Sequence, residues 1–282
     1  MSKKEIAIQL RRIAEALEQL VPPIPPRVDF TLANAFIWKA QDHVFDPVAL
    51  VAAVDLALLK GVESQRRLLL ANTQKFSHKL PANNVLLWGA RGMGKSSLVK
   101  SVHAALAHET GLKLIEIQRE DIDTLPHLLN LVSTVDEQFI VFCDDLSFDE
   151  SETRYKALKT ALEGGLRGQP KNVIFYATSN RRHLIARSMI ENEAGSAIDP
   201  GEVIEDKVSL SDRFGLWIGF HPCSQDDYLE MVFSYASYYN LNAPQDEIRA
   251  DALEWSITRG GRSGRVAWQY ICDLAGRLNM SL

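Results

Sequence analysis

The middle of the chain alternates between short apolar runs and longer amphipathic segments, from about residue 81 to residue 220. Each apolar run has the length of one buried strand, and each amphipathic segment has helical periodicity. This alternation is typical of a parallel sheet with helices on its faces. We therefore expect an α/β fold with five parallel strands, at residues 85–88, 112–117, 139–143, 172–177 and 216–220.

The two ends of the chain have helical patterns. Residues 3–20 are predicted to form an amphipathic helix, which ends at the proline-rich segment 22–26 and either packs on the main domain or docks onto a partner. Residues 30–60 are also apolar-periodic, and after residue 222 the pattern is helical throughout. We expect three parts, namely a helical N-terminal extension over 1–57, an α/β core over 58–222 and a small helical lid over 223–282.

Composition and charge are ordinary for a globular protein and exclude few functions. The 282 residues are 46% hydrophobic and 24% charged, which suffices for a large core and more than one domain. The net charge of −5 gives the whole molecule no reason to bind nucleic acid or an anionic membrane, although a local basic patch could bind either. Charges interrupt the first residues, so we expect no membrane span and a cytoplasmic protein.

A phosphate-binding motif lies between the first predicted strand and the helix after it. Residues Gly89 to Ser96 fill the pattern G-x-x-x-x-G-K-[ST], in which backbone N–H groups and the helix dipole converge on one point. Lys95 is expected to reach the β- and γ-phosphates, and the Ser96 hydroxyl to bind Mg²⁺. The sequence thus predicts an ATP site in which the phosphates are bound by Gly89, Ala90, Arg91, Gly92, Met93, Gly94, Lys95, Ser96 and Ser97.

Two aspartates follow the strand expected at residues 139–143. Because the carboxyl ends of parallel strands meet at one edge of the sheet, Asp144 should face Ser96 and support the Mg²⁺ ion. Asp145 is the candidate for polarising the attacking water, with Glu150 as a less favoured substitute. Aspartate is one methylene shorter than the glutamate that is common at this position, so we expect hydrolysis to be slow.

Three further polar side chains are candidates for catalysis. Asn180 follows the strand at 172–177, where its amide could orient the attacking water or cap the next helix. Arg213 precedes the last strand, at a rim from which it would reach the γ-phosphate of a neighbouring subunit. Arg265 lies in the first turn of the last predicted helix, where a positive charge is unfavourable beside the positive end of the helix dipole. We therefore expect Arg265 to bind an anion, with Arg262 as the second choice for this role.

Taken in order, these motifs resemble those of the AAA+ ATPase superfamily over about residues 58–280. The resemblance implies an AAA+ core with a helical lid, in which 89–96 is the Walker A motif and 139–145 the Walker B motif. Strings at 81–92, 142–148 and 176–184 look like a bacterial AAA+ family that is catalogued only as a domain of unknown function. The resemblance further assigns sensor 1 to Asn180, the arginine finger to Arg213, sensor 2 to Arg265, and adenine contacts to Gly61 and Val62.

The function that this resemblance implies is an ATP-dependent switch or remodelling ATPase. Such a protein would assemble into a homo-oligomer through ATP and Arg213, hydrolyse ATP at a site shared between subunits, and act on a protein client that the sequence does not identify. The pair Asp144-Asp145 replaces the common Asp-Glu, as in bacterial replication initiators that still hydrolyse ATP. The segment 117–121 is short and polar rather than an aromatic-glycine pore loop, which argues against a threading motor.

Two other functions stay open at this stage. A nucleic-acid-associated loader or initiator is favoured by the aspartate pair and by Arg181-Arg182, but the acidic total charge opposes it. A monomeric phosphotransferase could use the same phosphate loop. The helical lid with Arg265 opposes that reading, because small-molecule kinases do not usually carry one.

Overall fold

The computed structural model describes residues 9, 11–12, 29–148, 154–164, 168–182, 184 and 210–282. The helix expected at residues 3–20 lies almost wholly outside this part of the chain, as do the proline-rich segment and Glu150.

Five parallel strands form the centre of the molecule, as the apolar runs predict. They are β3 (Val85–Gly89), β4 (Lys113–Glu116), β5 (Phe139–Cys143), β6 (Val173–Ser179) and β7 (Leu216–Phe220). Their order in the sheet is β4-β5-β6-β3-β7, and every neighbouring pair is parallel. The strand that precedes the phosphate loop, β3, therefore lies between β6 and β7 in the sheet.

Two strands from the N-terminal extension enlarge this sheet to seven strands, so the prediction of an all-helical extension is wrong over 35–48. Strand β1 (Ala35–Lys39) pairs in parallel with β4, and β2 (Val44–Val48) pairs antiparallel with β1. The physical reason is a burial period of two: Phe36 and Trp38 lie on one face of β1 with the side chains of β4 and β5.

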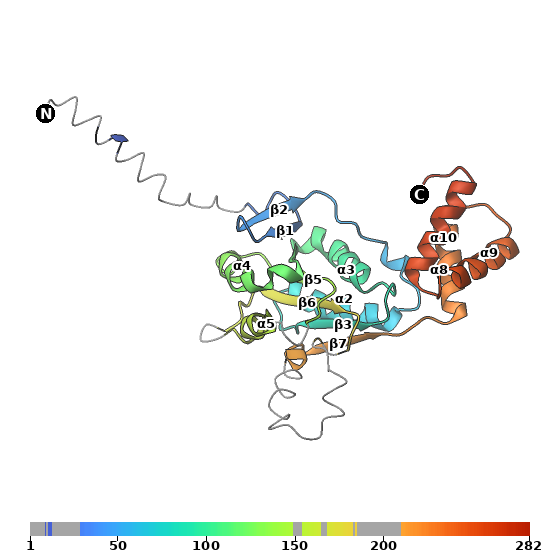
Figure 1. Ribbon diagram of the computed structural model, residues 1–282. Helices are drawn as coiled ribbons and strands as arrows, with labels where there is room; N and C mark the ends of the chain where they lie inside the picture. Colours follow the sequence, from blue (N-terminus) through green and yellow to red (C-terminus); the bar gives the residue numbers. More distant parts are fainter. Residues whose placement is uncertain are drawn as a thin grey trace, which may run out of the picture.

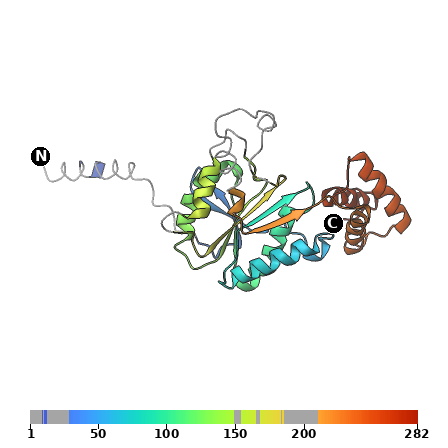
Figure 2. The same ribbon diagram turned by 90° about the horizontal axis from the view of Figure 1, so that it is seen from below.

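Helices cover both faces of the sheet (Figures 1 and 2). Along β3, the side chains of Val85 and Leu87 pack with α2 (Glu63–Ser77) and α3 (Lys95–Thr110). The side chain of Leu86 points to the other face, with the core formed by the 3₁₀ helix η2 (Arg119–Thr124), α4 (Leu125–Val132) and α5 (Arg154–Glu163). This layering is the α/β architecture that the sequence pattern predicts.

The last three helices form the expected lid. They are α8 (Gln225–Tyr238), α9 (Gln245–Thr258) and α10 (Gly264–Arg277), and they lie together at one end of the molecule in both views (Figures 1 and 2). Tyr228, Tyr270 and Ile271 are fully buried between them. A short 3₁₀ helix, η1 (Leu56–Leu58), contacts both α3 and α8 and so connects the core to the lid. None of the helices that the structure describes is long and apolar enough to cross a membrane.

Candidate nucleotide-binding site

The phosphate loop joins β3 to α3 and is fixed to the neighbouring strand β7. Gly89 has a φ of 121°, and a Cβ atom there would lie 2.0 Å from the carbonyl oxygen of Phe220, so only glycine fits this approach. The next residue, Ala90, donates its N–H to that same oxygen at 2.8 Å. Gly94 then caps α3 in a left-handed conformation. The loop is thus held at the carboxyl edge of the sheet, where α3 begins.

Lys95 is the central cation of the site, and all three of its N–H groups have acceptors. Its Nζ donates to the carbonyl oxygens of Gly89 and Ala90 at 2.9 Å each, and to Asn180 Oδ1 at 3.1 Å. Burial lowers the pKa of the Lys95 ammonium, while the carboxylates of Asp144 and Asp145 raise it. The side chain is therefore held in place, with an ammonium group beside two carboxylates.

Ser96 and Asp144 lie side by side, as the sequence predicts. Ser96 Oγ donates to Asp144 Oδ1 at 2.5 Å, and the hydroxyl of Thr178 donates to the same oxygen. Thr178 is buried and also accepts the N–H of Asp145 at 2.9 Å. Thr178 is a site residue that the sequence motifs do not predict. A polar residue near the end of an otherwise apolar strand was the available signal.

This donor set fits a magnesium ion. Mg²⁺ takes oxygen ligands and is usually bound by one or two protein groups together with substrate phosphates. Ser96 Oγ and the Asp144 carboxylate are such a pair. Within the described residues, no group of three or more His, Cys, Asp or Glu side chains could hold a metal ion. These two protein ligands leave the remaining positions of an octahedral Mg²⁺ ion to nucleotide phosphates and water.

Asp145 and Asn180 form the second polar pair. Asp145 has a φ of 51°, the left-handed conformation that aspartate tolerates better than most residues. Its carboxylate accepts a hydrogen bond from Asn180 Nδ2 at 2.6 Å. Because Asn180 also accepts from Lys95, one amide joins the candidate base to the phosphate-binding lysine.

Arg265 brings the lid to the phosphate loop. Its backbone N–H donates to the carbonyl oxygen of Gly92 at 3.1 Å, and its side chain lines the same cavity as Lys95. Arg91 and Arg265 both lower the pKa of Lys95, so their positive charges act on the same point. The second-choice arginine, Arg262, instead donates to Gln225 Oε1 at 3.2 Å within the lid.

Arg213 lies apart from this cluster. It is not among the described residues that line the cavity, and its guanidinium pairs with Glu163 at the end of α5, at 2.6 Å. About 44% of its side-chain surface is exposed, so a neighbouring molecule could reach it.

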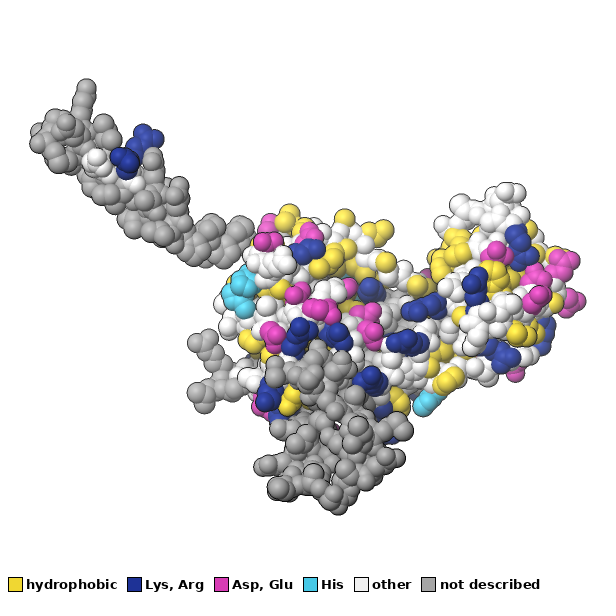
Figure 3. Space-filling view, in the orientation of Figure 1, with side chains coloured by type: hydrophobic (Ala, Val, Ile, Leu, Met, Phe, Trp, Pro, Cys, Tyr) yellow, Lys and Arg dark blue, Asp and Glu magenta, His cyan; other side chains and the backbone are white. Residues whose placement is uncertain are grey.

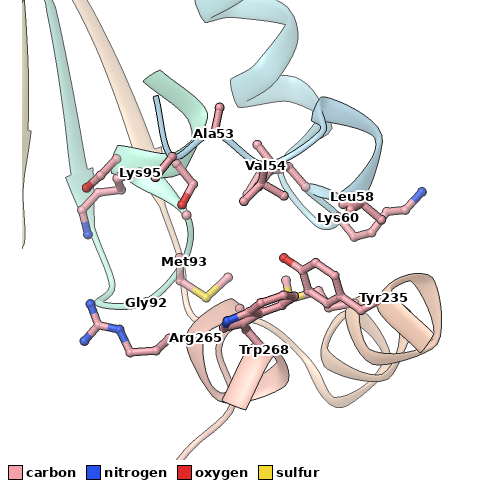
Figure 4. A pocket seen from close by; sticks show the side chains of 18 of the residues that line it. Ala53, Val54, Leu58, Lys60, Gly92, Met93, Lys95, Tyr235, Arg265 and Trp268 are labelled. Atoms are coloured by element: carbon pink, nitrogen blue, oxygen red, sulfur yellow. The ribbon is translucent and has the colours of Figure 1, made fainter. Parts of the chain in front are cut away.

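One cavity of about 980 Å³ connects the phosphate loop to the lid (Figure 4). The loop residues from Arg91 to Ser97 line one end. Gly89 and Ala90 are not part of the described lining, but their carbonyl oxygens accept hydrogen bonds from Lys95 Nζ. Val62 lines the other end, whereas its neighbour Gly61 is not part of the described lining. Sequence analysis missed most of this far end, which also includes Ala53, Val54, Leu58, Met231, Tyr235 and Trp268.

Comparison with known proteins identifies the family of the chain. A family model described as "Protein of unknown function (DUF815)" matches residues 31–278, which is most of the sequence. The chain belongs to this family. The description of the family agrees with the domain of unknown function that the motif strings resemble.

The chain is also similar to a curated protein outside this family description. It is 25% identical over 165 residues to the "Holliday junction branch migration complex subunit RuvB" of Mycoplasmopsis synoviae (strain 53). The alignment covers 58% of the chain and 48% of the relative, so the DUF815 protein spans about half of that relative's length.

Solved structures with a similar fold are known. The Thermotoga maritima RuvB Holliday junction branch migration motor aligns with a TM-score of 0.52 at 16% identity, over 80% of the DUF815 chain and 66% of that chain. The Aeropyrum pernix ORC1 protein in complex with DNA aligns with a TM-score of 0.54 at 15% identity, over 78% and 61%. At these identities the likeness concerns the fold alone. It confirms the AAA+ P-loop fold that the motifs imply.

Proposed function

We propose that this protein binds ATP with Mg²⁺, hydrolyses it, and uses the cycle as a self-assembling switch or remodelling factor. The observation that carries the proposal is the convergence of Lys95, Ser96 and Asp144 at the end of one cavity, with Asp145 and Asn180 beside them. Hydrolysis of a phosphoanhydride requires a cation, a pair of magnesium ligands, and a base with an amide that orients the water.

Each side chain has a definite task in this proposal. Lys95 binds the β- and γ-phosphates, and Asp144 with Ser96 supplies the protein ligands for Mg²⁺, which neutralises phosphate charge when bound. Asp145 accepts a proton from the water whose oxygen attacks the γ-phosphorus, and Asn180 orients that water. The bond from the γ-phosphorus to the β–γ bridging oxygen breaks, and ADP leaves with that oxygen. Arg265 binds the γ-phosphate from the lid, so loss of phosphate changes the contact between lid and core.

Arg213 is proposed to act in the site of a neighbouring subunit. An arginine that stabilises transition-state charge raises phosphoryl-transfer rates by about 10³ to 10⁵. Its place outside the cavity of its own chain, and its exposure, fit a role across a subunit boundary. The pairing with Glu163 would keep the guanidinium neutralised until a neighbour's phosphate competes for it.

The test is steady-state ATP hydrolysis measured over a range of protein concentrations. We expect the specific activity to rise with concentration, and Arg213→Ala to bind ATP normally but to turn over about 10³-fold more slowly. Arg259→Ala, which removes an arginine stacked on Trp255 at the lid surface, is the matched control and should behave like the wild type. Activity that does not depend on concentration, with normal turnover for Arg213→Ala, would discard the shared site.

A nucleic-acid-associated ATPase is the second candidate, and one surface favours it. Arg182 lies over the ring of Trp88 at 5.3 Å, next to the exposed Arg181, at the carboxyl edge of the sheet. Figure 3 shows several basic side chains, with acidic ones among them, across the middle of the face in view, although the net charge is −5. The name of the similar RuvB protein also mentions a Holliday junction, and the similar ORC1 structure is of a complex with DNA. Binding of single- and double-stranded DNA at several salt concentrations, with and without ATP, decides this point, because phosphate contacts weaken steeply with salt.

A further inference from the structure

The lid presents three aromatic side chains to the cavity, and we refer to Tyr235, Tyr239 and Trp268 as the aromatic wall. The ring centroids of Tyr235 and Trp268 are 5.4 Å apart, and those of Tyr239 and Trp268 are 5.7 Å apart, so each tyrosine supports the indole. Tyr235 is buried, whereas Trp268 keeps 36% of its surface exposed. The aromatic wall therefore has a rigid base and one large apolar surface that is open to the cavity.

The opposite side of the cavity is apolar and comes from the core. Val54 and Leu58 face Tyr235 and Trp268 across the cavity, which the phosphate loop borders with Met93 and Lys95 (Figure 4). Val54 is fixed through its carbonyl oxygen, which accepts the hydroxyl of Ser101 in α3. A slot between aliphatic side chains and an indole suits a flat aromatic ring that contributes area and stacking rather than charge.

Trp268 follows Arg265 by three residues on α10, so the two side chains project from the same face of the helix. They diverge from there: Arg265 extends toward Gly92 of the phosphate loop, and Trp268 lies toward the far end of the cavity (Figure 4). The first turns of α10, which carry Arg265 and Trp268, thus face both ends of the cavity. A ligand with a phosphate chain and an aromatic ring could contact both side chains at once.

We propose that Trp268 stacks on the base of the bound nucleotide, selects purines over pyrimidines, and makes α10 sense the base and the γ-phosphate together. This inference rests on the proposed function, because it names the ligand chemistry at the far end of the same cavity. Stacking on an aromatic side chain contributes about 5- to 150-fold in affinity per base. A purine has the larger ring surface and gains more from the indole than a pyrimidine.

The test is equilibrium binding of the Mg²⁺ complexes of ATP, UTP and inorganic tripolyphosphate, which has no base. For Trp268→Ala we expect about tenfold or greater loss of ATP affinity, a smaller ratio between ATP and UTP, and unchanged affinity for tripolyphosphate. Trp268→Phe should keep most of the ATP affinity, because it retains a stacking ring. Ile257→Ala, at a lid position that is 76% exposed, is the control and should leave all three affinities unchanged.

The outcomes separate this inference from the function on which it rests. If the wild type binds ATP and Lys95→Ala abolishes that binding, while Trp268→Ala binds like the wild type, the stacking role is overturned and the proposed function stands. Equal loss of ATP and tripolyphosphate in both Trp268 variants would also overturn it, because Trp268 would then act on the fold. A wild-type protein that binds neither ATP nor tripolyphosphate would overturn the proposed function itself.

Discussion

At the scale of single residues, Asn180 links the two halves of the proposed chemistry. Its oxygen accepts from Lys95 and its nitrogen donates to Asp145. A triphosphate that binds Lys95 would exchange the present acceptors of the ammonium group, Asn180 Oδ1 among them, for phosphate oxygens. The freed amide oxygen could then accept from a water molecule beside Asp145. Binding of the phosphates and placement of the water are in this way connected through one side chain.

Substitution of Asp145 separates binding from chemistry. Asp145→Asn keeps an acceptor for Asn180 but loses the base, so single-turnover hydrolysis should slow by about 10²- to 10⁴-fold. The affinity for MgATP should stay within a few-fold of the wild type, because the carboxylate does not bind the phosphates. Asp136→Asn, in the exposed turn before β5, is the control. Wild-type hydrolysis by Asp145→Asn would show that this carboxylate is not the base.

The sequence predicted the phosphate end of the cavity well and the far end poorly, for a physical reason. The residues from Gly89 to Ser96 are contiguous, and a motif of eight positions encodes the strand, the turn and the helix that place them. The far end is assembled from three separate segments: the chain around Val54, helix α8 with Tyr235 and helix α10 with Trp268. No local pattern records which of these apolar residues face a cavity and which face the core.

At the scale of elements, the contact between the phosphate loop and the start of α10 decides how the lid sits. A Cβ atom on Gly92, whose φ is 73°, would approach Ser263 Oγ at 2.8 Å and Arg265 Cβ at 3.2 Å. Ser263 is the residue that caps α10, and it accepts the N–H of Val266. The absence of a side chain at Gly92 therefore lets the lid helix rest directly on the loop.

Gly92→Ala tests this contact, and Gly111→Ala is its matched control. Both glycines have similar positive φ values, 73° and 69°, so both substitutions strain the backbone by about 1–2 kcal/mol. An added Cβ on Gly111 would meet nothing within 4 Å, whereas one on Gly92 would push against α10. We expect Gly92→Ala to lower MgATP affinity about tenfold or more and Gly111→Ala to lower only the free energy of unfolding. Equal ATP affinities for the two variants would contradict the proposed coupling of loop and lid.

Element prediction succeeded for the apolar runs of the core and failed over 35–48, where polar residues lie within and between the two strands. The core strands lie in apolar runs, and β5 and β6 are buried along their whole length, which is the strongest signal a parallel sheet gives. Strand β2 contains Asp46 and Pro47 among its five residues, and proline is tolerated there because β2 lies at the edge of the sheet. Its partner β1 is fixed to the sheet by β4, which is distant in sequence, so the periodicity over 30–60 alone predicted the wrong element.

At the scale of the whole molecule, the core and the lid are joined around one cavity. The proposed ligand would contact the core through Lys95 and Ser96 and the lid through Arg265 and Trp268. Its binding free energy would therefore act directly on the position of the lid, and hydrolysis would remove one of the contacts. Assembly through Arg213 extends this coupling from one chain to the next.

The central claim is that a nucleoside triphosphate binds Lys95 with a magnesium ion between Ser96 and Asp144. Its most direct test is equilibrium binding of ATP to the purified protein, with Mg²⁺ and with a chelator, for the wild type, Lys95→Ala and Lys100→Ala. Lys100 lies on the same helix and pairs with Glu116 at 3.7 Å, outside the cavity lining, so it is a matched control. We predict magnesium-dependent binding that Lys95→Ala weakens at least about tenfold and Lys100→Ala preserves. A folded wild type without magnesium-dependent affinity for any nucleoside triphosphate, or Lys95→Ala binding ATP as the wild type does, would contradict the account.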